Sequence, residues 1–420
     1  MKPMKMLSAG LVILTASVIG VQNANALPTF ARQTGVSCDV CHNGNFAALT
    51  PFGRNFKLHG YTMSTAKTLE KKITEATNEK LSLPTLPGIS GMMQISLTNT
   101  KKGSSGTQNS QLQTPEQLSL FLAGRLNNTM GIFSQFTMDD TGAWGLDNTD
   151  VRYADSTKLS DKNLDYGFTL DNSPTVGDLW NSTPTWGYPY QGGTSDTPSI
   201  LDGDATGGKV GVGTYGMLDN QFYGKVALYR SEADQAQAGN TVISSAAPYW
   251  RLAWQQNVGG GYLMLGTYGM YAKVIPDSVA TSTGIGGPEG KYLTTALDFQ
   301  YERPLAGENS LVAHGSYSRE KRTDLADDGS ISTGNSPTYK YSKLDMELNM
   351  AGRYRPGVSI FNTNTDTDNV DNTGYQLSME YFLSENVQFQ ATYSGYTKKD
   401  GATKNASDNN QVYLLMWLML

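Results

Sequence analysis

The sequence predicts an all-β protein: an antiparallel β-barrel of about sixteen strands, preceded by a small α-helical N-terminal segment. Three observations predict the barrel. Hydrophobic residues make up only 38% of the 420 residues, while Gly and Tyr number 45 and 23, a composition typical of many short strands with one apolar face. Short segments of alternating apolar and polar residues recur from about residue 89 to the end of the chain. The connections between these segments alternate in length.

The strands are predicted from period-2 alternation. The clearest is 386–393, where Val, Phe, Ala and Tyr occupy every second position and Gln or Thr occupies the positions between. Such alternation is typical of a strand with one apolar face. The sixteen expected strands are 89–99, 117–126, 130–138, 149–157, 163–171, 207–216, 220–230, 248–257, 261–272, 291–302, 309–319, 341–352, 357–363, 374–384, 386–397 and 410–420.

The connections after every second strand are short, and most of the others are long and polar. Outer-membrane barrels are built with short periplasmic turns and long external loops. We therefore expect residues 86–420 to form a barrel in the outer membrane of a Gram-negative bacterium, in contact with outer-membrane lipid, with both chain ends on the periplasmic side. Fourteen or eighteen strands and a soluble β-sandwich stay open as alternatives. The short connections are 127–128, 160–162, 218–219, 259–260, 304–308, 354–356 and 384–385.

Residues 1–26 predict a secretory signal peptide. Lys2 and Lys5 precede a short apolar core, and Ala24-Asn25-Ala26 is a small-x-small cleavage site. A membrane anchor would need a longer apolar run. Of the 32 basic residues, 30 remain without these two lysines, against 38 acidic residues. The resulting net charge of about −8 argues against nucleic acid as a partner.

Residues 27–85 do not fit the barrel pattern and contain the only two cysteines, Cys38 and Cys41, followed directly by His42. Cys-x-x-Cys-His is the attachment motif of c-type haem. The spacing places both thiols on one helical turn, where they can bond the haem vinyl groups, and the histidine can bind the iron. A redox disulfide needs a βαβ setting and a structural zinc site needs four ligands. We therefore predict one covalently bound haem c.

A helix over 51–59 is predicted after the motif. Thr50 is a favourable N-cap, proline follows it at the first helical position, and Gly60 stands just past the end. Residues 64–80 are expected to form a polar amphipathic helix, which together with 81–87 would tether the haem segment to the barrel.

The predicted helix over 51–59 offers side chains for the haem environment. Phe52, Phe56 and His59 are spaced to share one face, which is expected to face the haem. Arg54 and Lys57 lie on another face, where they can pair with haem propionates.

The sixth iron ligand stays open in the sequence. Met63 and His59 are the main candidates, and Met92 and Met93 open the first expected strand. A His/Met ligand pair raises the reduction potential, which would suit a weak electron donor such as ferrous iron.

The longest loop, within 171–190, carries Trp180, Trp186, Tyr188 and Tyr190. Two interpretations are open: the loop folds inward and narrows the pore, or it lies exposed at the surface.

The chain resembles the fused monohaem cytochrome–porin iron oxidases of iron-oxidising bacteria. The resemblance spans the chain, with specific motifs at the N-terminus and looser similarity in the barrel. The residues that carry it are 27–35, 38–42, 49–57, 60–62, 81–84, 172–190 and 405–410.

This resemblance implies a haem c inside an outer-membrane barrel, which takes electrons from extracellular Fe(II) or another redox species and passes them to a periplasmic c-type cytochrome. It implies haem attachment by Cys38, Cys41 and His42. It also implies Arg32, Arg54 and Lys57 as haem-environment residues.

The thickness of the membrane limits where one haem can work. The hydrocarbon layer spans roughly 25–30 Å, so a haem at the periplasmic rim would lie far from an external donor. We therefore expect 27–85 to fold into the lumen, where the barrel wall also stabilises so short a segment. Two other functions stay open: a transport porin with a structural or gating haem, and a conduit that exports electrons to an extracellular acceptor.

Overall fold

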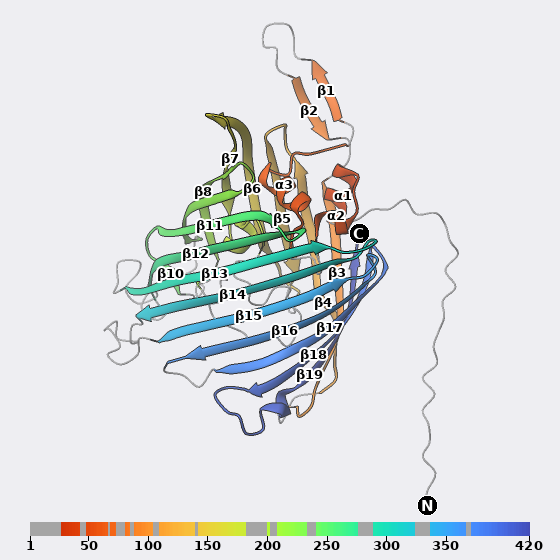
Figure 1. Cartoon of the computed structure of the whole chain (residues 1–420), viewed down its shortest axis with the longest axis vertical. Helices are drawn as coiled ribbons and strands as arrows, with labels where there is room; N and C mark the ends of the chain where they lie inside the picture. The colour runs from red at the N-terminus through yellow and green to blue at the C-terminus, as the bar shows by residue number, and fades with distance from the viewer. Residues whose placement is uncertain are drawn as a thin grey trace, which may run out of the picture.

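The computed structural model shows a closed antiparallel β-barrel, as the sequence predicts (Figure 1). Within the described residues, the ring has sixteen strands and closes where β19 pairs with β3. The predicted signal peptide lies outside these residues. The structure describes residues 27–42, 48–65, 68–72, 80–84, 88–103, 109–138, 142–181, 200–201, 208–232, 241–275, 289–323, 337–366 and 371–420.

The strands follow one another around the ring in chain order, and each of the sixteen predicted strands corresponds to one of them. Their bounds are β3 (Ile89–Thr100), β4 (Gln111–Arg125), β5 (Met130–Met138), β6 (Trp144–Leu159), β7 (Lys162–Asp171), β8 (Lys209–Leu218), β9 (Phe222–Ser231), β11 (Ala247–Val258), β12 (Gly261–Ile275), β13 (Gly290–Pro304), β14 (Ser310–Thr323), β15 (Thr338–Asn349), β16 (Tyr354–Thr365), β17 (Asn372–Ser384), β18 (Val387–Lys398) and β19 (Gln411–Met419). The short β10 (Val242–Ile243) pairs with the end of β12, and β9 pairs directly with β11.

The turns between the paired strands lie where the sequence predicts them, with one shift. The turn between β15 and β16 is 350–353 rather than 354–356. Ala351 and Gly352 supply the left-handed backbone of this turn, with φ of 51° and 66°, whereas Pro356 lies inside β16 and opposite Met379.

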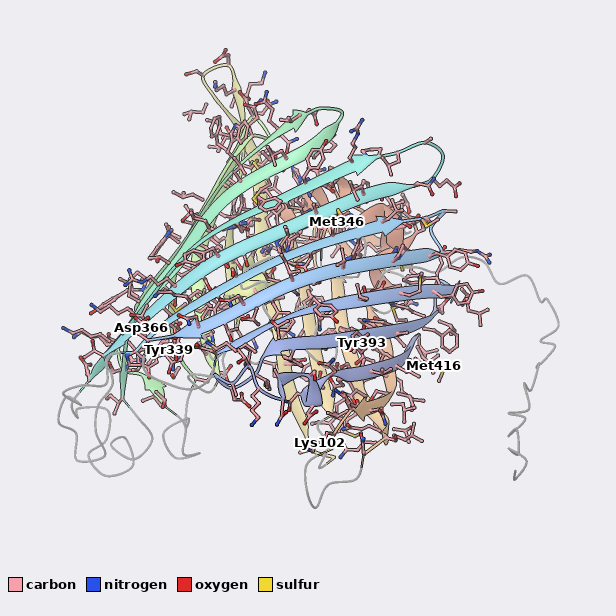
Figure 2. The ribbon with its side chains drawn as sticks, turned by 60° about the horizontal axis from the view of Figure 1, so that its bottom comes forward. Lys102, Tyr339, Met346, Asp366, Tyr393 and Met416 are labelled. Carbon is pink, nitrogen blue, oxygen red and sulfur yellow. The ribbon has the colours of Figure 1, made fainter. Side chains whose placement is uncertain are left out.

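The outer face of the barrel wall is apolar, and much of its inner face is polar. In β18, Gln388 and Gln390 are buried on the inner face, while Phe389 between them is exposed on the outer face. Figure 2 shows Met346, which is 47% exposed, on the outer face of β15. Exposed Leu, Val, Ile and Phe side chains recur on the outer faces of neighbouring strands. A closed barrel with such an outer band is the architecture of outer-membrane barrels.

In the described part of the chain before the barrel, three short helices lie at the end with the short turns, close to the C-terminus (Figure 1). They are α1 (Pro28–Thr34), α2 (Cys38–Cys41) and α3 (Pro51–Leu58). The third agrees with the predicted helix: Thr50 caps it by accepting a hydrogen bond from the Gly53 amide at 3.1 Å, and Gly60 follows with a φ of 65°. None of the described helices is long and apolar enough to cross a membrane.

The predicted helix over 64–80 is wrong. The structure has β1 (Thr68–Lys72) paired antiparallel with β2 (Lys80–Pro84), and this hairpin projects away from the barrel in Figure 1. Pairing with β1 gives the alternating 81–83 cross-strand backbone partners, which a helix ending at residue 80 would not supply. An isolated helix of this length is also only marginally stable.

The helical segment contacts the inner wall of the barrel on several sides. Thr29 Oγ1 donates to the Ala123 carbonyl of β4 at 2.9 Å. On another side, Tyr215 Oη of β8 donates to the Leu58 carbonyl at 2.8 Å. These contacts place the described parts of this segment, 27–42 and 48–65, against the inner wall at the short-turn end.

Candidate functional site

The cysteine motif forms a compact unit within the lumen. Cys38 and Cys41 are the first and last residues of α2, one helical turn apart, as the spacing predicts. Both are buried, and neither is in a disulfide. Burial and, to a smaller extent, the Asp39 carboxylate raise the pKa of the Cys41 thiol to about 12, so it is protonated at neutral pH. His42 follows in an extended conformation and forms an isolated β-bridge with Leu49.

Close packing holds this unit in place. A Cβ added to Gly53 would lie 2.1 Å from the Cys41 carbonyl oxygen, so only glycine permits α3 to approach α2 this closely. The Thr50 amide donates to the same carbonyl at 3.0 Å. On the other side, the carboxylate of Glu385, in the turn between β17 and β18, accepts a hydrogen bond from the Cys38 backbone. The motif therefore lies between a helix and a turn of the barrel.

A cavity opens next to Cys41 and His42. It contains about 1210 Å³ of unfilled space, solvent at its mouth included. Its wall comes from the helical segment, from β3 to β6 and β19, and from the connection between β7 and β8. The aromatic residues that line it are Phe30, Phe56, Tyr61, Phe121, Phe133 and Trp417.

The aromatic side chains pack as one cluster across the segment and the wall. The Phe30 ring centroid lies 5.0 Å from that of Phe56 and 5.2 Å from that of Tyr61. Phe133 of β5 stacks on the same Phe30 ring at 6.5 Å. The Tyr61 hydroxyl donates to Asp150 of β6 at 2.5 Å, so this residue is anchored to the wall. The cavity is therefore apolar and rigidly bounded on this side.

The first part of the connection between β7 and β8 folds into the lumen, which confirms the inward interpretation for residues 172–181. Its short helix α4 (Pro174–Gly177) is followed by Trp180, which is 0% exposed. Arg251 of β11 forms a buried ion pair with Asp178 at 3.0 Å, and its guanidinium lies 5.3 Å from the Trp180 ring centroid. Trp186, Tyr188 and Tyr190 lie outside the described residues.

Lys57 joins the helical segment to this inward connection and lines the cavity. Its Nζ donates to the carbonyls of Val176 and Asp178, both at 2.6 Å, and to Asn181 Oδ1 at 2.5 Å. Burial, reinforced by the Arg152 guanidinium, lowers the pKa of Lys57 to about 7. The three acceptors favour the charged form, and together they link α3 to the connection.

Only some of the predicted haem-environment residues line the cavity: Phe56 and Lys57 do, whereas Arg32, Phe52 and Arg54 do not. Arg54 Nη1 instead lies 2.5 Å from Glu302 of β13 and donates to the Leu49 carbonyl at 2.6 Å. Arg32 Nη2 donates to the Ile89 carbonyl at 2.6 Å. These two arginines connect the helical segment to the wall.

The two main sequence-based candidates for the sixth ligand lie away from the cavity. Met63 is 37% exposed. His59 Nδ1 lies 2.8 Å from the Asn55 carbonyl, and its Nε2 lies 3.3 Å from Asp165 of β7. His59 is the C-cap of α3, so its side chain leaves the helix face that the spacing predicts. Neither residue lines the cavity beside His42.

The sequence did not single out the wall of the cavity. Phe133, Trp417 and Met419 line it, but 413–420 is apolar at both parities, so alternation could not show which of its side chains face inward. Met92 also lines the cavity, and its inward orientation follows from its alternation with the buried Gln94.

No model of a protein family matches the chain, and no curated protein matches it. Among solved structures, the chain is similar to the OmpF–daunomycin complex of Salmonella typhi, with 11% identity, a TM-score of 0.49, and coverage of 79% of this chain and 97% of that one. It is also similar to the channel DcaP of Acinetobacter baumannii, with 11% identity, a TM-score of 0.48, and coverage of 79% and 96%. Values this low support no functional statement, and the barrel is established by its own strand pairing.

Proposed function

We propose that the cavity holds one haem c and that the protein transfers electrons across the outer membrane. Cys38 and Cys41 would form the thioether bonds, and His42 would bind the iron. The observation that carries this proposal is the position of the motif: two cysteines outside any disulfide lie one helical turn apart, and Cys41 and the following His42 border an aromatic-lined cavity inside a barrel. This donor set and this apolar wall fit a haem c.

The residues around the cavity suit a buried redox group. A bound haem would supply reversible one-electron transfer. Phe30 and Phe56 cover one side with apolar surface and keep water out. Lys57 lies at the edge of the cavity, where its charged form would attract a propionate while its three hydrogens stay bonded to the protein.

The electron donor that we propose is extracellular Fe(II), and the acceptor is a periplasmic c-type cytochrome. Each Fe(II) ion gives up one electron and leaves as Fe(III), and the periplasmic partner takes up that electron. The resemblance to cytochrome–porin iron oxidases supports this direction. The position of the cavity at the short-turn end supports a short transfer to the periplasm, and the donor side would then be reached through the lumen.

A second candidate function is transport through the barrel, with the haem as a structural or gating group. Barrels of sixteen to eighteen strands can hold an aqueous channel, and the connection between β7 and β8 folds inward and is held to the wall by the Asp178–Arg251 ion pair. The architecture supports this function more directly than it supports iron oxidation. Export of electrons to an extracellular acceptor is the third possibility.

The experiment uses the full chain in detergent micelles and in liposomes. Haem staining after denaturing electrophoresis tests covalent attachment, and Cys38→Ser with Cys41→Ser is the matched control that should lose the stain. Fe(II) at neutral pH is then mixed with the oxidised protein while haem absorbance is followed. Reduction by Fe(II) supports iron oxidation, whereas reduction by dithionite alone contradicts it.

Conductance separates the remaining functions. An open channel whose conductance does not depend on redox state would favour transport. A strongly negative reduction potential would make electron transfer from Fe(II) unfavourable and would favour electron export. A chain that carries no covalent haem would overturn the proposal entirely.

A further inference from the structure

The cavity beside His42 holds a second set of iron-binding atoms, provided by the barrel wall. Axial ligands of haem iron in proteins are imidazole, thiolate, thioether and phenolate groups. Of the described residues that line the cavity, Tyr61, Met92 and Met419 carry such groups in addition to the motif. The Tyr61 hydroxyl donates its hydrogen bond to the Asp150 carboxylate at 2.5 Å. The thioethers of Met92 and Met419 are therefore the remaining candidate ligands.

These two methionines form a cross-strand pair. Met92 of β3 lies directly opposite Met419 of β19 in the register that closes the barrel. Residues directly opposite each other point to the same face of a sheet, and both side chains are turned inward, with exposures of 4% and 7%. Gly91 and Leu420 exchange two backbone hydrogen bonds of 2.9 and 2.8 Å beside them. The pair is therefore fixed in position.

The turn between β17 and β18 connects this pair to the cysteine motif. Asn386 accepts a hydrogen bond from the Met419 amide at 2.9 Å and donates to the Met419 carbonyl at 2.9 Å. Its neighbour Glu385 accepts a hydrogen bond from the backbone of Cys38. One turn thus contacts both the end of β19 and the start of α2.

We propose that a thioether of the Met92–Met419 pair is the sixth ligand of the haem iron, opposite His42. This inference rests on the proposed haem c and assigns its second axial position to the barrel wall rather than to Met63 or His59. Ligation by a barrel residue would make the haem a bridge between the N-terminal segment and the closing strands. A His/Met pair would also raise the reduction potential.

The test replaces each methionine by leucine, which keeps side-chain volume nearly unchanged. The variants are Met92→Leu, Met419→Leu and the double variant, all in the full haem-loaded chain. Met93→Leu is the matched control, because Met93 follows Met92 in the chain and its side chain points to the opposite face of β3. Met63→Leu tests the sequence-based alternative. The readouts are the sulfur-to-iron charge-transfer band of the oxidised haem and the reduction potential.

We expect the wild-type protein, Met93→Leu and Met63→Leu to show the charge-transfer band. We expect at least one of Met92→Leu and Met419→Leu, and certainly the double variant, to lose it and to have a lower reduction potential. A band that persists in the double variant, that is lost in Met63→Leu, or that is missing from the wild-type haem overturns this assignment alone. A chain without covalent haem overturns it together with the proposed function.

Discussion

The buried ion pair between Arg54 and Glu302 should decide how firmly α3 is docked to the barrel. Arg54 Nη1 lies 2.5 Å from the Glu302 carboxylate, and both side chains are at most 6% exposed. Removing one partner of a buried pair costs about 3–5 kcal/mol, because it leaves the other charge buried without it. At about 1.4 kcal/mol per tenfold, Arg54→Met should increase the local opening of α3 by roughly 100- to 3,000-fold.

Hydrogen exchange of the α3 amides in detergent micelles measures this opening. The amides of Arg54 and His59, which donate to Thr50 and Asn55 within the helix and its cap, are suitable reporters. The double variant Arg54→Met/Glu302→Gln removes both charges, so its exchange should return most of the way toward the wild-type rate.

An exposed ion pair is the control for this prediction. Lys102, visible at the long-loop end in Figure 2, lies 3.2 Å from Asp408 and is 73% exposed. Lys102→Met should therefore change stability by less than about 1 kcal/mol. The reasoning is refuted if Arg54→Met leaves the hydrogen exchange of α3 unchanged. It is also refuted if the change in the opening free energy of α3 in the double variant equals the sum of the changes in the two single variants.

Three further predictions concern the outer face, the cap of α3 and a buried amine. Leu297 is 63% exposed at the middle of β13. The Leu297→Arg substitution should destabilise the folded barrel in lipid by about 2–4 kcal/mol, as measured by denaturant titration in vesicles. An unchanged unfolding midpoint would contradict the assignment of Leu297 to the lipid-facing side. Thr50→Ala should destabilise α3 by about 1 kcal/mol, seen as faster amide exchange than in wild type, and equal rates would argue against the cap. The pKa of Lys57 is about 7 in the folded state and about 10.4 in the unfolded state, so between these pH values only the unfolded state keeps the proton. In this pH range the unfolding free energy should therefore rise with pH, by up to about 1.4 kcal/mol per pH unit. A Lys57→Met variant whose unfolding free energy has the same slope would contradict this prediction.

The strands could be predicted because their signal is local. In an antiparallel barrel every strand has one lipid-facing and one lumen-facing side, so alternation appears within each segment of eight to twelve residues. The helix of 51–58 could be predicted for the same reason, since Thr50 and Gly60 mark its two ends. The pairing of 68–72 with 80–84 was missed because its stability depends on contact between two segments, and the spacing of Leu69 and Ile73 in the sequence also fits a helix.

The site could be predicted only in part. Cys38, Cys41 and His42 carry a motif that is complete within five residues. The sequence predicted that Arg54 pairs with a haem propionate, whereas the structure places its guanidinium against the Glu302 carboxylate. That contact joins positions far apart in the chain, and no local pattern could have indicated it.

By itself, the sequence determined the class of the protein, the strand order, the alternation of turns and loops, and the reactive motif. The tertiary structure decided what surrounds the motif. Closure of the ring brings β3 and β19 together and sets Met92 opposite Met419, although they lie near opposite ends of the barrel sequence. It also turns Trp180 into the lumen. Period-2 patterns specify which face a residue takes, but only closure of the barrel specifies which residues meet across the space inside.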